Sequence, residues 1–356
     1  MESIKRFLGL VKTPTQLVDR MHFEFRVMDG EETTEKPRKI LRRFTQMRDY
    51  LIGAHTKTPN LAKCEELASA TIETHLTLKV LEHFTKLDLE ERKMYVTVFS
   101  ILVTNDYGKF ATVYMMSAEG AQILKLILDG YGNSQIALNC GIMIRECIKQ
   151  RCIHEYLLDN SDLIEPLFTV YAHSPTFEIS SDAFSTIQTL MRRNKQLVSK
   201  KMNANGPLYG RVFGWFNNMI NSKEYVTRRM ALQLLNEFLL DKVNFDIMIA
   251  YVGDVKNLMG IMTVLRTPQA IIQYEAFHVF KVFVANPDKT PEITLILQQN
   301  ADKLISYLTN FLPERDNEQQ FVEEKKLLIN MLKKLKSQDD ECILKQIGRA
   351  SCRERV

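Results

Sequence analysis

The sequence predicts an all-α protein, as its composition and a recurring apolar pattern both indicate. Only 14 Gly and 10 Pro occur in 356 residues, so few positions interrupt a helix. Leu, Ile, Met, Lys, Glu and Gln are abundant, and these side chains lose little rotamer freedom in a helix. A chain of this length also exceeds what a single hydrophobic core supports, so it must divide into domains or extend as a repeat array.

Five segments share one pattern, in which a small or neutral residue is followed by apolar residues at helical spacing. The segments are 95–103, 140–148, 183–191, 231–239 and 276–284. Their starts lie 45, 43, 48 and 45 residues apart by subtraction, and armadillo and HEAT units repeat about every 40–47 residues. One such unit cannot bury both faces of its helices, whereas stacked units share a continuous core. The sequence therefore predicts an armadillo/HEAT-like, right-handed α-solenoid that forms a curved rod.

The two ends of the chain differ from this repeating middle. Residues 1–12 are predicted to form an N-terminal tail, followed by one armadillo-like domain over residues 13–336 that ends on the charged helix Asp316–Lys336. Terminal repeats of solenoids are commonly atypical caps, which fits these ends. Residues 337–346 are expected to be a frayed tail, and residues 347–356 resemble the translation of a common sequencing adapter rather than native protein.

Short polar dipeptides mark the expected starts of three helices. These start signals are Asn133-Ser134, Ser174-Pro175 and Thr267-Pro268. A Ser, Thr or Asn side chain accepts a hydrogen bond from a backbone N–H of the first turn, and Pro presets the helical φ angle. We therefore expect helices to begin directly at these dipeptides.

Composition excludes several classes of function. The net charge is +4 with acidic and basic residues interspersed, so the dense basic face of a nucleic-acid binder is not expected. No apolar run reaches the roughly 18 residues of a membrane span, and the N-terminal residues do not form a signal peptide. The six Cys lie mostly in apolar helical contexts, where a free thiol packs as a small hydrophobe. The protein is expected to be cytoplasmic, with its cysteines reduced.

No motif indicates catalysis, so neither an enzyme nor a cofactor is expected. The Gly-Tyr-Gly segment at 130–132 lacks the third glycine of a dinucleotide fingerprint and follows a helix instead of a strand. Cys147, Cys152 and His154 are types that bind metals, but no further ligands or tight turns accompany them. The acidic segment Asp29–Glu32 lacks the alternating oxygen ligands of a calcium-binding EF-hand. No metal site, calcium included, is predicted.

One segment combines side chains typical of protein interfaces. Tyr225, Arg228 and Arg229 open a predicted repeat helix. Arginine at a helix N-terminus opposes the macrodipole, so another interaction should favour it there. Phe177 holds a similar place one repeat earlier, and Tyr and Arg are enriched at interface hot spots. A solvated arginine pair beside an aromatic contact within the chain explains the pattern equally well.

Four stretches of the sequence resemble the calcium-binding protein 39 family. They are residues 136–148, 177–184, 225–229 and 274–287. The last, Tyr-Glu-Ala-Phe-His-Val-Phe-Lys-Val-Phe-Val-Ala-Asn-Pro, is the most specific. The resemblance covers about residues 13–336 and implies an armadillo-like scaffold without catalytic activity.

The resemblance also implies partners. Members of the family bind the STRAD pseudokinase, support its complex with a tumour-suppressor liver kinase, and activate germinal-centre-type kinases. A scaffold that binds the active-like conformation of a kinase better than the inactive one shifts the population without any phosphoryl chemistry of its own. We therefore expect a kinase-activating scaffold that is a monomer within its hetero-complex.

Some residues can be matched to the family's concave kinase-binding face. Phe177, Tyr225 and Arg229 match positions on this face, and Phe245 matches a position that contacts the catalytic kinase. Lys242 stands where the family commonly has Arg, which keeps the charge but loses bidentate pairing.

A separate C-terminal pocket of the family takes the Trp-Glu-Phe tail of a partner. Met262 and Lys303 match this pocket, whereas Met259 and Gln299 replace two basic residues. Because the lost positive charge weakens attraction for an acidic tail, this chain is expected to bind such a tail more weakly.

An alternative function, from a different class, is a peptide-binding adaptor in transport or cell-polarity complexes. Armadillo adaptors usually line their groove with a ladder of Trp and Asn side chains, and this chain has only one tryptophan, Trp215. The partners that co-purify with the protein, kinases or transport cargo, distinguish the two functions.

Overall fold

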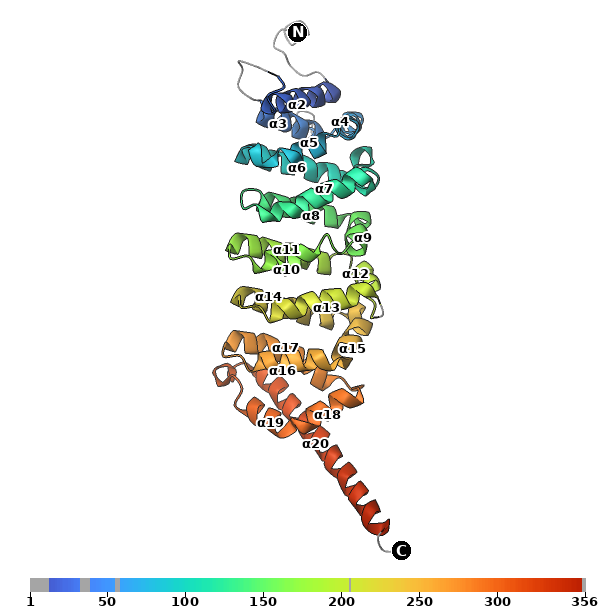
Figure 1. Ribbon diagram of the computed structural model, residues 1–356, viewed down its shortest axis with the longest axis vertical. Helices are drawn as coiled ribbons and strands as arrows, with labels where there is room; N and C mark the ends of the chain where they lie inside the picture. Colours follow the sequence, from blue (N-terminus) through green and yellow to red (C-terminus); the bar gives the residue numbers. More distant parts are fainter. Residues whose placement is uncertain (1–12, 33–38, 55–57, 205, 354–356) are drawn as a thin grey trace. The chain divides into compact units, whose positions relative to one another are not determined.

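The structure is a computed structural model that describes residues 13–32, 39–54, 58–204 and 206–353, with side chains up to residue 337. Over these ranges it contains α-helices and short 3-10 helices and no strand (Figure 1). The chain divides into two compact units, Met1–Lys201 and Met202–Val356. The predicted N-terminal tail, residues 1–12, lies outside the described residues.

The first described helix of unit 1 starts at Pro14. Thr13 accepts a hydrogen bond from the Gln16 N–H, and Pro14 fills the first helical position. Gly53, with φ 67°, ends the second helix in the left-handed conformation that glycine adopts without strain. The α-helices of unit 1 are α2 (Pro14–Met28), α3 (Ile40–Ile52), α4 (Leu61–Glu73), α5 (Leu76–Glu82), α6 (Leu89–Asn105), α7 (Ala118–Asp129), α8 (Ala137–Lys149), α9 (Arg151–Asp159), α10 (Glu165–Thr169), α11 (Phe177–Arg192) and α12 (Lys195–Lys201). Its 3-10 helices are η1 (Phe84–Lys86), η2 (Tyr107–Lys109), η3 (Tyr114–Met116), η4 (Gly130–Gly132) and η5 (Tyr171–His173).

Unit 2 continues the same alternation of long and short helices. Its α-helices are α13 (Pro207–Ile220), α14 (Tyr225–Leu240), α15 (Phe245–Gly253), α16 (Val255–Leu265), α17 (Ala270–Ala285), α18 (Pro291–Gln299), α19 (Ala301–Thr309) and α20 (Gln319–Arg353), and its 3-10 helices are η6 (Lys242–Asn244) and η7 (Pro313–Arg315). Among the described helices none alone has the length and hydropathy to cross a membrane. One pair, Lys242–Gly253 and Val255–Leu265, has them only jointly and is bent by 82°.

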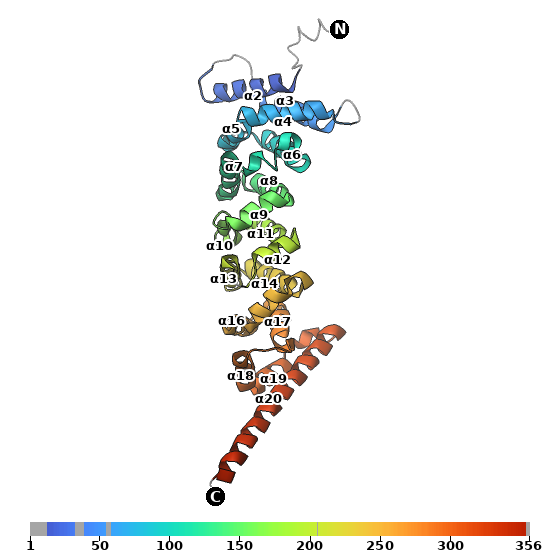
Figure 2. The same cartoon turned by 90° about the vertical axis from the view of Figure 1, so that its right-hand side faces the viewer.

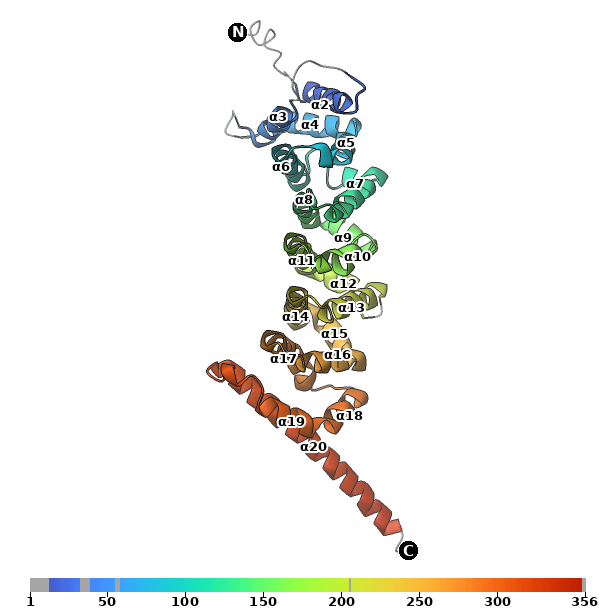
Figure 3. The same ribbon diagram turned by 60° about the vertical axis from the view of Figure 1, so that its left-hand side comes forward.

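The five repeat segments of the sequence lie in five corresponding helices, which we call the ladder helices: α6, α8 and α11 in unit 1, and α14 and α17 in unit 2. In unit 1, α8 packs between α6 and α11, and in unit 2, α14 packs against α17. Figures 2 and 3 show the ladder helices of each unit in one row, with α7 of unit 1 and α13 and α16 of unit 2 in a second row. The predicted all-α solenoid is confirmed in each unit, while the handedness and curvature of the whole chain stay predictions.

Small residues mark the places where ladder helices are most enclosed. Ala183, Ala231 and Ala276, each the first residue of a repeat segment, are all 0% exposed. The rest of the core is made by the apolar residues of the repeat pattern and by aromatic side chains such as Phe184 and Phe277, which are almost fully buried. Burial of this apolar surface is the main term that holds the stacked helices together.

The predicted starts of three ladder helices are wrong by two or three residues. Helices α8, α11 and α17 begin after the expected cap dipeptides, and none of their N-caps makes a side-chain hydrogen bond. Before α11 and α8 the polar side chain instead shapes the turn that precedes the helix: Ser174 Oγ accepts a hydrogen bond from the Thr176 N–H at 3.2 Å, and Asn133 Oδ1 accepts one from the Gln135 N–H at 2.9 Å. Phe177, rather than Pro175, therefore occupies the first helical position of α11.

The last helix is longer than predicted. Helix α20 runs from Gln319 to Arg353 instead of ending at Lys336. Phe321 and Leu328 on this helix are buried, whereas Leu327 is 52% exposed. The foreign origin of residues 347–356 and the other domain limits stay predictions.

Candidate partner-binding face

The first five residues of α14 include three of the predicted site residues, Tyr225, Arg228 and Arg229. Its N-cap, Glu224, makes no side-chain hydrogen bond to the helix, and Ser222 Oγ accepts a hydrogen bond from the Glu224 N–H in the preceding turn at 3.2 Å. Tyr225 is the first helical residue and is 38% exposed, and Val226 beside it is 39% exposed. The helix therefore presents an aromatic ring and an aliphatic side chain at an open end, where a partner can bury them.

Arg228 and Arg229 are adjacent in sequence but have different environments. Arg228 is half-buried, and its Nε donates a hydrogen bond at 3.1 Å to the Ile220 carbonyl at the C-terminal end of α13, where a cation is favoured. Arg229 is exposed, with its Nε 3.7 Å from Glu275 Oε1 on α17, an ion pair too long for a hydrogen bond. The hydrogen bond to Ile220 explains why an arginine is favoured at position 228, because it links α14 to α13. Among the described residues Arg229 makes only the long contact with Glu275, so its N–H groups can bind a partner.

Phe177 in unit 1 occupies the repeat position that Tyr225 occupies in unit 2. Each lies six residues before the buried Ala of its ladder helix, Ala183 or Ala231, and each is the first residue of that helix. Phe177 is 63% exposed. Stacking of repeats brings equivalent positions to the same side of a solenoid. That Phe177 and Tyr225 belong to one partner-binding face stays a prediction.

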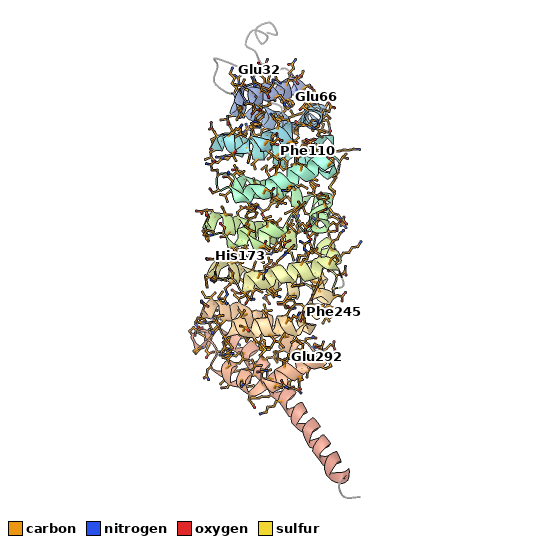
Figure 4. The ribbon with its side chains drawn as sticks, in the orientation of Figure 1. Glu32, Glu66, Phe110, His173, Phe245 and Glu292 are labelled. Carbon is orange, nitrogen blue, oxygen red and sulfur yellow. The ribbon has the colours of Figure 1, made fainter. Side chains whose placement is uncertain are left out.

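Lys242 and Phe245 lie close together after the end of α14. Lys242 is exposed at the start of η6, and Phe245, the first residue of α15, is 58% exposed (Figure 4). Two more apolar side chains in this segment, Leu240 and Val243, are 57% and 39% exposed. Asn244 Nδ2 donates to the Phe238 carbonyl at 2.9 Å and fixes the turn. The exposure of Leu240 and Val243 could not be predicted from the sequence, because an exposed apolar residue is indistinguishable from a core residue in the repeat pattern.

The four predicted tail-pocket residues are mostly exposed. Met259 on α16 is 50% exposed, Met262 is half-buried, and Gln299 and Lys303 are exposed at the junction of α18 and α19. Helices α16 and α18 pack together. A cavity of about 510 Å³ in unit 2 lies elsewhere, between the start of α17 and the end of α19, and none of the four residues lines it. A tail-binding role for these residues stays a prediction.

A groove between α6 and α8 lies on the ladder helices of unit 1. Its volume is about 490 Å³, and its lining includes Ile101 and Ile142, with Lys93 and Glu146 as charged members. Ile142 is 42% exposed, and Leu138, one turn earlier on α8, is 45% exposed. The ladder helices of unit 1 therefore expose apolar side chains, as a protein-binding surface does.

Two carboxylates that were not predicted from the sequence link consecutive ladder helices. Asp182 on α11 binds Arg145 on α8, with the closest ion-pair atoms 2.8 Å apart. Glu275 on α17 accepts a hydrogen bond from Gln233 Nε2 on α14 at 2.6 Å, through the same oxygen that faces Arg229. Asp182 and Glu275 each directly precede the buried Ala of their repeat. An acidic residue directly before the first Ala of a repeat segment is therefore the sequence feature from which these two links could have been predicted.

Burial keeps two titratable side chains inside unit 1, His154 and Cys140, in their neutral forms. His154 is fully buried, its Nε2 lies 3.0 Å from the Leu190 carbonyl, and its Nδ1 lies 3.1 Å from Asn194 Nδ2. A neutral ring that donates from Nε2 and accepts at Nδ1 satisfies both contacts. Burial lowers the pKa of His154 to about 4 and raises the pKa of the Cys140 thiol to about 12. Within the part of the chain that the structure describes, no group of three or more His, Cys, Asp or Glu is placed to hold a metal ion.

Comparison with known proteins decides the family. The model of the family described as Mo25-like matches residues 7–336. The chain belongs to the Mo25-like family. Calcium-binding protein 39-like of Homo sapiens is 34% identical to it over 94% of this chain and 99% of its own length. MO25-like protein 2 of Caenorhabditis elegans is 35% identical, with 91% and 97% covered, and the degreening-related gene dee76 protein of Auxenochlorella protothecoides is 38% identical, with 82% and 89% covered.

Membership of the Mo25-like family confirms the resemblance seen in the sequence and the armadillo-like fold. As a Mo25-like protein, the chain is a scaffold protein, and its human and mouse relatives are named as binding proteins rather than as enzymes. An engineered protein of known structure aligns with 93% of this chain and 88% of its own, but its 10% identity and TM-score of 0.35 are too low to show a common fold.

Proposed function

We propose that this protein is a non-catalytic scaffold that binds protein kinases or pseudokinases of the STRAD and germinal-centre type and raises their activity. The observation that carries the proposal is the open first turn of α14, where exposed Tyr225 lies near Arg229, whose contact with Glu275 is long. A partner carboxylate that binds the Arg229 guanidinium at two points makes a shorter and stronger contact than Glu275 does.

Activation follows if this surface fits one kinase conformation better than the other. A ligand shifts a two-state equilibrium only by its differential affinity, so a tenfold preference for the active-like conformation is worth about 1.4 kcal/mol. The scaffold supplies that preference through contacts alone. The kinase provides the phosphoryl chemistry.

Binding of a purified STRAD-like or germinal-centre-type kinase domain to the full chain tests the proposal. We expect Tyr225→Ala and Arg229→Ala each to weaken binding by about tenfold or more, the range of interface hot spots. Because both side chains are exposed, the melting temperature should stay that of the wild type. The kinase activity of the partner should rise with wild-type scaffold and fall back with either variant.

Matched controls use exposed side chains far along the chain from α14. Arg42→Ala removes an exposed arginine from α3, and Leu61→Ala removes an exposed apolar side chain from α4. Both controls should bind the kinase as the wild type does. Equal binding by all four variants and the wild type would sink the proposed site, and no binding by the wild type would sink the proposed partner class.

We propose further that the protein works in the cytoplasm, as a single copy within a hetero-complex. Light scattering of the complex with its kinase domain measures the stoichiometry, and a fluorescent fusion in cells shows the compartment. Two scaffold copies per complex, or a signal confined to a membrane compartment, would contradict these two points.

A further inference from the structure

One carboxylate oxygen on α17 faces two side chains of α14. Arg229 and Gln233 are four residues apart on α14, so both project from the same face of that helix. Gln233 Nε2 donates a hydrogen bond to Glu275 Oε1 at 2.6 Å, whereas Arg229 Nε lies 3.7 Å from the same oxygen. The neutral amide therefore makes the hydrogen bond, and the charged guanidinium does not.

This order is the reverse of what the two donors alone favour. A guanidinium binds a carboxylate more strongly than an amide does, and such pairs are usually about 2.7–2.9 Å long. Arg145 and Asp182 in unit 1 have this usual arrangement, with two contacts at 2.8 and 2.9 Å. The Arg229 side chain, in contrast, is 44% exposed and reaches Glu275 only at long range. Arg229 is thus held near a carboxylate without being hydrogen-bonded to it.

The environment of Glu275 explains why the second donor matters. The Glu275 side chain is 12% exposed, and a carboxylate with little access to water needs hydrogen-bond donors from the protein. The bond from Gln233 supplies one, and it can stay in place when Arg229 turns toward a partner. Without that bond, Glu275 would have to draw on Arg229, the other side chain that the structure places at this oxygen.

We propose that Gln233 and Glu275 are positioning residues for partner binding, because the hydrogen bond between them keeps the Arg229 guanidinium available to a carboxylate of the partner. The inference rests on the proposed kinase-binding function and deepens it. Glu275 attracts the guanidinium across 3.7 Å and limits its directions, while Gln233 prevents it from closing on Glu275. A partner carboxylate then meets a partly oriented cation and does not have to break an internal ion pair first.

The side-chain Nε–H signal of Arg229 tests this arrangement in the free protein by NMR. The full chain is labelled with ¹⁵N-arginine, and the signal is assigned by its loss in Arg229→Ala. Gln233→Met removes the amide donor and nearly keeps the side-chain volume. We expect the Arg229 Nε–H proton of this variant to exchange with water about fivefold more slowly, because the guanidinium closes on Glu275. Unchanged exchange would overturn the role of Gln233.

A second substitution shows whether the slower exchange comes from the carboxylate. Glu275→Gln keeps the shape of the side chain and removes its charge. In Gln233→Met/Glu275→Gln the guanidinium has lost the carboxylate on which it would close, so its Nε–H proton should exchange at least as fast as in the wild type. A signal that stays slow in the double variant would contradict the proposal, since Glu275 would then not be the group that binds Arg229.

Binding of the kinase domain tests the consequence for the partner. We expect Gln233→Met to weaken binding about fivefold, the cost of breaking one internal ion pair, and to have no further effect when it is combined with Arg229→Ala. Gln122→Met removes an exposed glutamine from α7 and should bind and melt as the wild type does. An equal loss with and without Arg229 would mean that Gln233 contacts the partner directly, which would overturn its positioning role.

The two proposals fail separately. Kinase binding that falls in Arg229→Ala but not in Gln233→Met removes the positioning role and leaves the scaffold function standing. If the wild type binds no kinase domain, the proposed function fails, and the Arg229 signal of the free protein still decides whether Gln233 keeps the guanidinium away from Glu275. A slower exchange in Gln233→Met then supports the arrangement, and an unchanged one overturns it.

Discussion

The guanidinium of Arg145 and the carboxylate of Asp182 meet side by side, through one pair of atoms at 2.8 Å and a second at 2.9 Å. Tyr131 O–H, from η4, donates to the same carboxylate at 2.8 Å. The Arg145 and Asp182 side chains are 21% and 13% exposed. One half-buried carboxylate thus joins η4, α8 and α11.

Removing the arginine from this cluster should destabilise unit 1. Arg145→Ala leaves Asp182 as a largely buried charge with Tyr131 as its remaining donor, and we expect a loss of about 2–4 kcal/mol in the free energy of unfolding. Urea unfolding followed by circular dichroism measures it. Lys93→Ala, which removes an exposed partner of Glu90, should leave stability nearly unchanged. A similar cost for both variants would contradict a buried role for Arg145.

The same cluster leaves no room for a side chain at Gly141 on α8. A Cβ added there would lie 2.7 Å from both Tyr131 Oη and Asp182 Cγ. Alanine is intrinsically better than glycine inside a helix by about 1 kcal/mol, yet we expect Gly141→Ala to destabilise the protein by about 1–3 kcal/mol.

Two glycines of α13 provide the control for that substitution. A Cβ at Gly210 or Gly214 meets nothing within 4 Å. Alanine at these positions should raise the free energy of unfolding by up to about 1 kcal/mol, measured in the same urea titration. We expect the free energy of unfolding to fall in Gly141→Ala and to rise in Gly210→Ala. A rise in Gly141→Ala would show that Tyr131 and Asp182 can move aside at little cost.

Substitution of Arg228 should affect mainly the stability of the fold, and substitution of Arg229 should affect mainly partner binding. Arg228→Ala removes the hydrogen bond to the Ile220 carbonyl and should lower the free energy of unfolding by about 1 kcal/mol. Arg229→Ala should leave the melting temperature unchanged and weaken partner binding. Thermal unfolding and kinase binding of the two variants, measured side by side, check this. The reverse assignment of the two effects would contradict the geometry of α14.

Stability should fall in mild acid because of His154. Burial lowers the pKa of this ring to about 4 from its ordinary value of 6.5, so between these values the unfolded chain binds more protons than the folded one. Its contribution is therefore complete above pH 6.5 and is lost as the pH falls toward 4, with an upper limit of roughly 3 kcal/mol.

Unfolding free energies between pH 7 and pH 4 measure this dependence. His154→Gln should flatten the curve, although not fully, because burial also lowers the pKa of His22 and His278. His22→Gln serves as the comparison and should flatten it less. An unchanged slope in His154→Gln would mean that the buried ring is not the source of the acid sensitivity.

The long helices could be read from the sequence because the repeat of apolar residues is a local pattern. The starts at Ala183, Ala231 and Ala276 fall inside helices α11, α14 and α17, as predicted. The exact first residues could not be predicted for α8 and α11, because the side chains of Asn133 and Ser174 can accept hydrogen bonds from backbone N–H groups of the preceding turn as readily as from those of the helix.

The roles of the site residues depend on contacts that a local pattern does not contain. Arg228 donates to a backbone carbonyl. Because every residue has such a carbonyl, the sequence contains no residue type that identifies the partner of Arg228 or its structural role. Arg229 and Arg145 each face a carboxylate on the next ladder helix, about one repeat further along the chain. Only the stacking of the repeats brings such pairs together, and the fixed place of Asp182 and Glu275 in the repeat becomes informative once that stacking is known.

The polar links that the structure describes between ladder helices join neighbouring repeats. Arg145 and Asp182 are 37 residues apart, and Gln233 and Glu275 are 42 residues apart. In a stack held by nearest-neighbour interfaces, a substitution disturbs its own repeat and the adjoining ones and fades beyond them. Such a stack can change the shape of one groove during evolution while the more distant grooves keep theirs.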